Sequence, residues 1–317
     1  MWLESNHVVS VDNFNSADEL CRFFEKVARL KRAHEGGARS HLWHEYRDRL
    51  RGHIMASLFY QPSTRTRFSF ESAMLQLGGS VIGTENAAEF SSTIKGESLQ
   101  DSVLVVGYYA HVIVIRHPEV GSAAQAAQVS KVPVINAGDG TGEHPTQALL
   151  DLYTIWEQLS EKHTFTLTLV GDLKRGRTVH SLVKLVKKFN RHPALGLECR
   201  IVCISPDALR LPSELVTLSG AEVTEYRKLS KRLVQESDVI YMTRTQSEHG
   251  VVGQADPIVL TPELAEFLRP GAKILHPLPR NEELPVTIDT LPQAHYFAQA
   301  ENGLYVRMQL LLDLLQQ

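Results

Sequence analysis

Short apolar runs alternate with amphipathic helices along nearly the whole chain. We expect strands at residues 54–60, 80–83, 112–115, 132–136, 166–170, 199–204, 221–226, 239–243 and 273–276. Between these runs, apolar residues recur at helical spacing, as Leu149, Leu152, Tyr153 and Trp156 do. Strands that alternate with helices build βαβ units, in which the strands are parallel and helices cover both faces of the sheet. The sequence therefore predicts an α/β fold.

The chain is long enough for two domains of ordinary size, because it has 317 residues. A long helix that opens at His144 can carry the chain from the first domain into the second. The last helix has a wide apolar stripe (Leu304, Met308, Leu311, Leu312, Leu315), which we expect to pack back on the first domain. We therefore predict two domains joined by long helices: residues 1–150 completed by a helix at about 292–317, and residues 151–291.

Composition and the absence of several motifs argue against some classes of function. The net charge is −3, so the chain lacks the overall positive charge that would favour binding to nucleic acid. We expect a cytoplasmic protein without a membrane span, because no apolar stretch is long enough and the N-terminus lacks a signal-peptide pattern. The chain has three cysteines, of which Cys199 and Cys203 fit small buried residues of a strand better than a metal pair. Paired carboxylates, a Ser-His-Asp arrangement and His-Glu-x-x-His are not evident, so hydrolase, glycosidase and metalloprotease chemistry lack support.

The run Ser63-Thr64-Arg65-Thr66-Arg67 lies between an expected strand and an expected helix. The start of a helix offers unpaired backbone amides and a partial positive charge, to which these hydroxyls and Arg65 add donors. Such a turn suits phosphate. The alternative is an ordinary N-cap at Ser63 or Thr64 with solvated arginines.

More cationic groups follow the other expected strands. They are Arg116, His144, Arg177, Arg244 and the run His276-Pro277-Leu278-Pro279-Arg280. Ligands of parallel α/β sheets bind at the carboxyl ends of strands, so these positions predict a cleft for small, multiply anionic substrates. Two other segments are less specific. Gly138-x-Gly140-x-Gly142 fits a turn better than a dinucleotide site. Residues 84–98 are a long polar stretch that, taken alone, fits a surface loop better than a lid.

Five motifs together resemble one family. Ser63–Arg67, His144-Pro-Thr-Gln147, the run Gly171 to His180, Met242-Thr-Arg244-x-Gln246 and His276–Arg280 occur in the order found in aspartate transcarbamoylase catalytic chains. The resemblance spans nearly the whole chain. It implies transfer of a carbamoyl group from carbamoyl phosphate to the amino group of L-aspartate, an early step of pyrimidine synthesis. The reaction requires no metal, cofactor or covalent nucleophile.

The resemblance also implies a role for each matching residue. Residues 1–150 would bind carbamoyl phosphate and residues 151–291 aspartate. Carbamoyl phosphate would contact Ser63, Thr64, Arg65, Thr66, Arg116, His144, Gln147 and the Leu278 carbonyl, and aspartate would contact Arg177, Arg244, Gln246 and Pro279. The main catalytic groups would be Arg65, Thr66, Lys95, Arg116 and His144. Ser91 and Lys95 match a loop that enters the site of a neighbouring subunit, which implies a homotrimer with shared sites and gives residues 84–98 a function. Ser91 would contact carbamoyl phosphate, and Lys95 would contact both substrates.

Two departures and two alternatives remain. Gln61 stands where allosteric bacterial members have an acidic residue, and the segment from Gln246 to about Pro262 is shorter and lacks an extra arginine, which puts subunit-coupled switching in doubt. The chain could carbamoylate another anionic amine, or it could be a catalytically silent scaffold. Regulatory chains and pathway-enzyme partners are not readable from the sequence. Arg280 is expected to have a structural role or to support residues that bind the substrates.

Overall fold

A computed structural model describes residues 6–37, 40–85, 96–159, 164–190, 192, 198–218, 222–244 and 256–316. The chain forms two compact units. Unit 1 contains residues 1–150 and 302–317, and unit 2 contains residues 151–301. The divisions fall inside two helices, α7 (Pro145–Leu159) and α12 (Tyr296–Leu315). The chain thus returns to unit 1 at Asn302, about ten residues later than the sequence suggested.

Unit 1 is built on a parallel sheet that has four strands among the described residues, in the order β2-β1-β3-β4. The strands are β1 (Ile54–Phe59), β2 (Ser80–Glu85), β3 (Val112–His117) and β4 (Val134–Asp139). Besides α7 and α12, the helices are α1 (Ala17–Glu35), α2 (His41–His44), α3 (Thr64–Gln76), α5 (Leu99–Val106) and α6 (Ser122–Val129), with a 3₁₀ turn η1 (Val11–Asn13).

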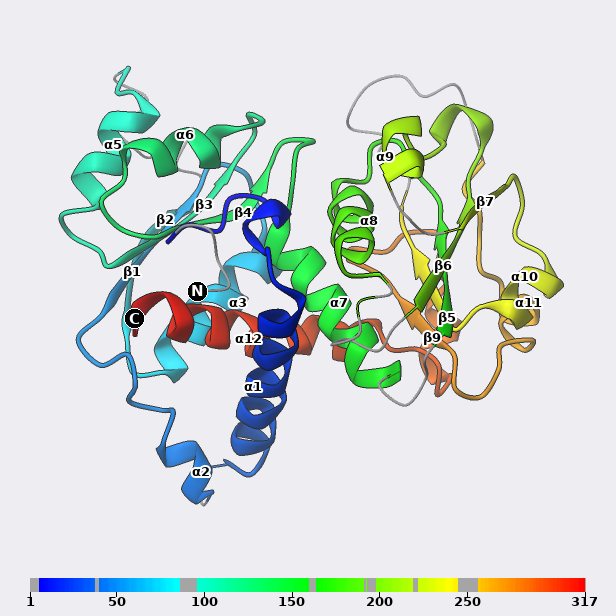
Figure 1. The fold of residues 1–317 in the computed structure, drawn as a ribbon, viewed down its shortest axis with the longest axis horizontal. Helices are drawn as coiled ribbons and strands as arrows, with labels where there is room; N and C mark the ends of the chain where they lie inside the picture. Colours follow the sequence, from blue (N-terminus) through cyan, green and yellow to red (C-terminus); the bar gives the residue numbers. More distant parts are fainter. Residues whose placement is uncertain are drawn as a thin grey trace. The chain divides into compact units, whose positions relative to one another are not determined.

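The two faces of this sheet are covered by different helices (Figure 1). Side chains of α5 and α6 pack on one face, where Ala56, Leu58, Ile113 and Ile115 alternate with residues of the other face. On the other side, α12 contacts α3, because the Arg307 guanidinium donates to Ser69 Oγ at 2.8 Å and lies over the Phe70 ring. It also contacts α1, through Lys26 and Asp313 at 3.1 Å. Of the apolar stripe of the last helix, Met308, Leu311 and Leu312 are buried and Leu304 and Leu315 are half-buried, and all five belong to unit 1.

Unit 2 is built on a second parallel sheet, with five strands among the described residues in the order β7-β6-β5-β8-β9. The strands are β5 (Thr164–Val170), β6 (Glu198–Ile204), β7 (Val223–Tyr226), β8 (Val239–Met242) and β9 (Lys273–Leu275). The remaining elements are α8 (Arg177–Phe189), α9 (Ser213–Leu218), α10 (Lys231–Glu236), α11 (Pro262–Ala265), η4 (Asp207–Leu209) and η6 (Val286–Thr290). The predicted α/β fold with two parallel sheets is confirmed.

The structure also tests the prediction that Cys199 and Cys203 are small buried residues of a strand. Cys199 and Cys203 lie in β6, and both are buried free thiols. Burial raises the pKa of Cys203 to about 12, and that of Cys199 even further above its ordinary value. They are therefore small core residues, as expected.

None of the described helices combines the length and the apolarity that crossing a lipid bilayer would require.

Candidate active site

In unit 1, three neighbouring strands end at one edge of the sheet. Phe59 of β1 pairs with Arg116 of β3, and the Tyr60 amide donates to the Arg116 carbonyl at 2.8 Å. On the other side of β3, His117 pairs with Asp139, the last residue of β4. The sheet register therefore brings the segments that follow β1, β3 and β4 together. The segments after β1 and β4 contain Ser63–Arg67 and His144, and Arg116 lies next to the last residue of β3.

The first of these segments opens helix α3. Ser63 occupies the N-cap position, but its side chain makes no capping hydrogen bond to the first amides of the helix. The N-cap alternative is therefore right about the position of Ser63 and wrong about its hydroxyl. Thr66 is buried, whereas Thr64 and Arg65 are exposed. Uncapped amides at a helix start favour an anion.

Arg67, in the same run, has a structural partner. Its Nε donates to Glu71 Oε1 at 2.7 Å, and the same oxygen accepts from Ser57 Oγ of β1 at 3.0 Å. The pair joins α3 to the sheet beneath it. Glu71 stands four residues after Arg67, a spacing that commonly places opposite charges in contact on a helix.

Arg116, His144 and Gln147 lie at the same edge of the sheet. Arg116 Nη1 donates to the Ala137 carbonyl of β4 at 3.0 Å, which lays the guanidinium across the neighbouring strand. His144 is buried and comes just before Pro145, the first residue of α7, and its carbonyl accepts from the Gln147 amide at 3.0 Å. Thus the fold fixes the backbone of all three residues at strand and helix ends.

Asp139 organises the turn between β4 and α7, and sequence reasoning missed it. Its carboxylate accepts from the amides of Gly121 at 2.8 Å and Glu143 at 2.7 Å, and from the side chain of Asn136 at 3.2 Å. These bonds tie the start of α6 to the turn that carries His144. An Asp at the end of a strand, beside a glycine-rich turn, is the signal that could have revealed it. The predicted turn at Gly138–Gly142 is present, and it starts at Gly140.

In unit 2, the neighbouring strands β5, β8 and β9 also end at one edge. The amide and hydroxyl of Thr243 both donate to the Val170 carbonyl, at 2.8 and 3.0 Å, and so join the ends of β8 and β5. Arg177 is the first residue of α8, and Arg244 comes two residues after β8. Both are half-buried. The predicted acceptor residues of this unit therefore follow adjacent strands.

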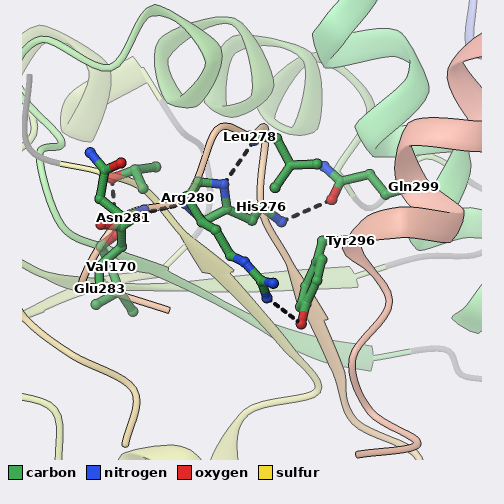
Figure 2. Close-up of polar contacts among 9 residues, drawn as sticks. Val170, His276, Leu278, Arg280, Asn281, Glu283, Tyr296 and Gln299 are labelled. Atoms are coloured by element: carbon green, nitrogen blue, oxygen red, sulfur yellow. Dashed lines mark hydrogen bonds and ion pairs between the residues drawn. The ribbon is translucent and has the colours of Figure 1, made fainter. Parts of the chain in front are cut away.

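The strand β9 leads into the turn His276–Arg280. Leu278 is half-buried, Pro279 is exposed, and the peptide bond between them is cis. Arg280 forms an ion pair with Asp289. Its guanidinium also donates to the Tyr296 hydroxyl at 2.9 Å (Figure 2). Hydrogen bonding from Arg280 lowers the pKa of Asp289 to about 2. The expected structural role of Arg280 is confirmed.

Three residues of the predicted site, Ser91, Lys95 and Gln246, lie outside the described residues. The other positions fall into two sets, each at the carboxyl edge of one sheet. Unit 1 carries the Ser63–Arg67 run, Arg116, His144 and Gln147, and unit 2 carries Arg177, Arg244, Leu278 and Pro279. Both sets are rich in cations and hydrogen-bond donors, which suits anionic ligands.

Comparison with protein families agrees with this chemistry. Residues 6–157 match the family described as aspartate/ornithine carbamoyltransferase, carbamoyl-P binding domain, and residues 163–314 match the Asp/Orn binding domain of the same family. The chain belongs to the aspartate/ornithine carbamoyltransferase family.

Individual carbamoyltransferases resemble the chain over nearly its full length. It is 42% identical to the chloroplastic aspartate carbamoyltransferase of Oryza sativa subsp. japonica, over 99% of this chain and 86% of that protein. It is also 42% identical to the aspartate carbamoyltransferase catalytic subunit of Thermoplasma acidophilum, over 99% of each chain. The predicted resemblance to aspartate transcarbamoylases is confirmed.

Solved carbamoyltransferase structures share the fold. The aspartate transcarbamoylase of Trypanosoma cruzi in complex with aspartate and phosphate superposes with a TM-score of 0.85 and 35% identity, over 96% of this chain and 94% of that one. The same enzyme in complex with carbamoyl phosphate and aspartate gives a TM-score of 0.82 and 34% identity, over 96% and 95% of the two chains.

Proposed function

We propose that this chain transfers the carbamoyl group of carbamoyl phosphate to the amino group of L-aspartate. The products are N-carbamoyl-L-aspartate and phosphate, and the reaction is a step of pyrimidine biosynthesis. One observation carries this function: the chain matches, over 96% of its length, a Trypanosoma cruzi enzyme solved with aspartate and phosphate. The cationic groups at the two sheet edges support the proposal, because both substrates are anions.

The donors of unit 1 fit the carbamoyl half of the reaction. We assign the phosphate to the uncapped start of α3, with Ser63, Thr64, Arg65 and Thr66. We assign the carbonyl oxygen to Thr66, Arg116 and His144, and the carbamoyl amide to Gln147 and the Leu278 carbonyl. As the amine attacks, negative charge grows on the carbonyl oxygen, and each fixed donor there can contribute about 3–4 kcal/mol.

Bond changes in this reaction need few groups from the protein. The new N–C bond forms as the C–O bond to phosphate breaks, and the departing phosphate accepts the proton that the amine loses. Orientation of two mutually repelling anions is the larger task, and fixed cations accomplish it. In this proposal Arg65 and Lys95 neutralise the phosphate, and His144 acts as a neutral donor to the carbonyl oxygen.

Acceptor choice is assigned to unit 2. Arg177, Arg244 and Gln246, with Pro279 and with Lys95 from unit 1, would hold the two carboxylates of aspartate. Ornithine has only one carboxylate, and its cationic side chain would be repelled by the two arginines. We expect aspartate to be carbamoylated at least a hundredfold faster than ornithine in a coupled phosphate-release assay. Equal or reversed rates would exclude the aspartate assignment.

A surface of unit 1 supports a homotrimer with shared sites. Phe68 and Leu75 of α3 are 59% and 57% exposed, and Ile82 of β2 is 41% exposed. Phe68 and Leu75 are seven residues apart and so lie on one helix face, and β2 is the edge strand of its sheet among the described residues. Exposed apolar residues beside an open strand edge favour association. Ser91 and Lys95 follow β2 in the sequence, and in our proposal they complete the site of the next subunit.

Mixed trimers test the shared site. Lys95→Ala and Arg65→Ala homotrimers should each turn over poorly, because every site carries a lesion. After dissociation and reassembly together, some interfaces join an intact Lys95 to an intact Arg65, and part of the activity should return. Native mass measurements must show that both variants are trimers. Mixed trimers as inactive as their parents would refute sharing.

We also propose a cytoplasmic location. All three cysteines of the chain are free thiols, which suits a reducing compartment. The Oryza sativa relative is chloroplastic, so fractionation of the source cells is the test.

A further inference from the structure

The turn after β9 is held by a buried histidine. His276 and Glu283 are 2% and 3% exposed. The Leu278 amide donates to His276 Nδ1 at 2.8 Å, and His276 Nε2 lies 2.9 Å from Glu283 Oε1 (Figure 2). The residue between donor and acceptor is Pro277, so the His276 side chain closes a tight loop onto its own backbone two residues later.

These contacts define the tautomer of His276. Nδ1 accepts the Leu278 N–H, so the ring proton is on Nε2, from which it is donated to Glu283. Glu283 Oε1 also accepts from the Asn281 amide at 2.8 Å. Burial alone would raise the pKa of Glu283, but hydrogen bonds from His276 and from the Asn281 and Glu283 amides outweigh it and hold the pKa below its usual value. An ionised Glu283 accepts hydrogen bonds only, and this keeps the Nδ1 atom of His276 as an acceptor.

The backbone at Leu278 requires such support. Its φ is +50°, in the left-handed region that side chains other than glycine rarely adopt. Strained conformations of this kind persist only where surrounding contacts impose them. The backbone of His276 is itself fixed, since its amide donates to Gln299 Oε1 at 2.8 Å, and Gln299 Nε2 donates to Asp151 Oδ1 at 2.6 Å. The acceptor for the Leu278 amide is thus anchored at both its main chain and its ring.

We propose that His276, oriented by Glu283, is a positioning residue that sets the direction of the Leu278 carbonyl. This inference rests on the proposed function, in which that carbonyl accepts a hydrogen bond from the carbamoyl amide. The conformation of Leu278 determines where its carbonyl points. Loss of the bond between Nδ1 and the Leu278 amide should therefore weaken the binding of carbamoyl phosphate but not the binding of phosphate itself.

Two substitutions separate this role from simple packing. His276→Asn places an amide oxygen near the position of Nδ1, where it can accept the Leu278 N–H in an Asx turn, but it cannot reach Glu283. His276→Gln resembles histidine more closely in length and carries its amide at the position of Nε2, next to Glu283. It lacks an acceptor for Leu278. A packing role favours His276→Gln, whereas a positioning role favours His276→Asn.

Steady-state kinetics of the full-length protein give the readout. We expect His276→Gln to raise the KM for carbamoyl phosphate about tenfold, the effect of one lost neutral hydrogen bond, and His276→Asn to stay within about threefold of wild type. The inhibition constant for inorganic phosphate should not change in either variant. Equal KM values for the two variants, or a lower KM for His276→Gln, would overturn the proposal.

Controls separate the possible failures. If wild type does not carbamoylate aspartate, the proposed function fails; the positioning role is judged only against an active wild type. Thermal unfolding shows whether each variant folds. Should His276→Gln not fold, His276→Ser and His276→Ala give a second pair of nearly equal size, in which only serine can accept the Leu278 amide in an ST turn. The alanine variant must then show the higher KM for carbamoyl phosphate, and equal values would refute the role.

Discussion

Gly171 lies where the ends of β5 and β8 meet, and replacing it with alanine should disturb both folding and aspartate binding. Its φ is +117°, and a Cβ atom there would lie 2.2 Å from the Thr243 carbonyl oxygen and 2.6 Å from Thr243 Oγ1. Thr243 immediately precedes Arg244. Relief of the contact therefore requires movement of the segment that carries a proposed aspartate ligand.

The cost follows from two contributions. An alanine held at this φ costs about 1–3 kcal/mol. Separating the two strand ends by the roughly 1 Å that the contact requires costs about another 1–3 kcal/mol, as overpacking does in other packed regions. In a unit of this size, 1 kcal/mol lowers Tm by about 2–4 °C, so Gly171→Ala should lower it by about 4–24 °C. The KM for aspartate should rise at least about tenfold, and phosphate inhibition should not change.

Two other glycines are matched controls, assayed with Gly171→Ala by scanning calorimetry. A Cβ at Gly271, also in unit 2, would have no atom within 4 Å, and the residue needs no left-handed backbone. Gly52 has a φ of +85° but equally open surroundings, so Gly52→Ala measures the conformational cost alone. The reasoning is refuted if Gly171→Ala unfolds within 2 °C of Gly271→Ala, or if it destabilises no more than Gly52→Ala.

Two further predictions concern the oxyanion and pH. Arg116→Ala and His144→Ala should each lower kcat by about a hundredfold or more, because each removes a fixed donor from the developing oxyanion. Circular dichroism should show that both variants fold. Near-normal turnover in either variant would show that the replaced residue is not part of the site. His180 is half-buried, and this partial burial lowers its pKa below the ordinary 6.5. The Leu173 carbonyl, 2.8 Å from its Nε2, acts in the opposite direction. The unfolded chain then binds the proton more readily, so the free energy of unfolding should fall as pH drops below about 6.5. His180→Gln, which keeps a donor for Leu173, should make the decline between pH 7.5 and pH 5.5 shallower in urea titrations, and an unchanged slope would contradict this assignment.

Much of the fold could be predicted because most elements carry a strong local signal. Most strands are apolar runs, and Ser16 is a typical N-cap residue of α1, whose hydroxyl accepts from the Glu19 amide at 3.3 Å. Helix α6 was missed. Its buried residues Ala123 and Ala126 are small, so its apolar face gave no clear period.

The site residues could be predicted where they lie at the ends of strands. Contacts inside irregular turns could not. Because parallel strands end at the same edge of a sheet, the order of the strands is the only long-range information needed to bring Ser63, Arg116 and His144 together. The contact between His276 and Glu283 could not be inferred, because it lies in an irregular turn that has no periodicity. The assignments of Ser91, Lys95 and Gln246 remain predictions from the resemblance.

The discontinuity of unit 1 has a consequence for protein synthesis. Its final segment, residues 302–317, is translated only after all of unit 2, yet Arg307 and Asp313 pack against α3 and α1 near the start of the chain. Unit 2 is continuous and has its residues available before that segment emerges from the ribosome. The growing chain must therefore keep the apolar faces of α1 and α3 in an incomplete core while unit 2 is made. Domains that are contiguous tend to fold as they appear, so the second unit can reach its native state before the first.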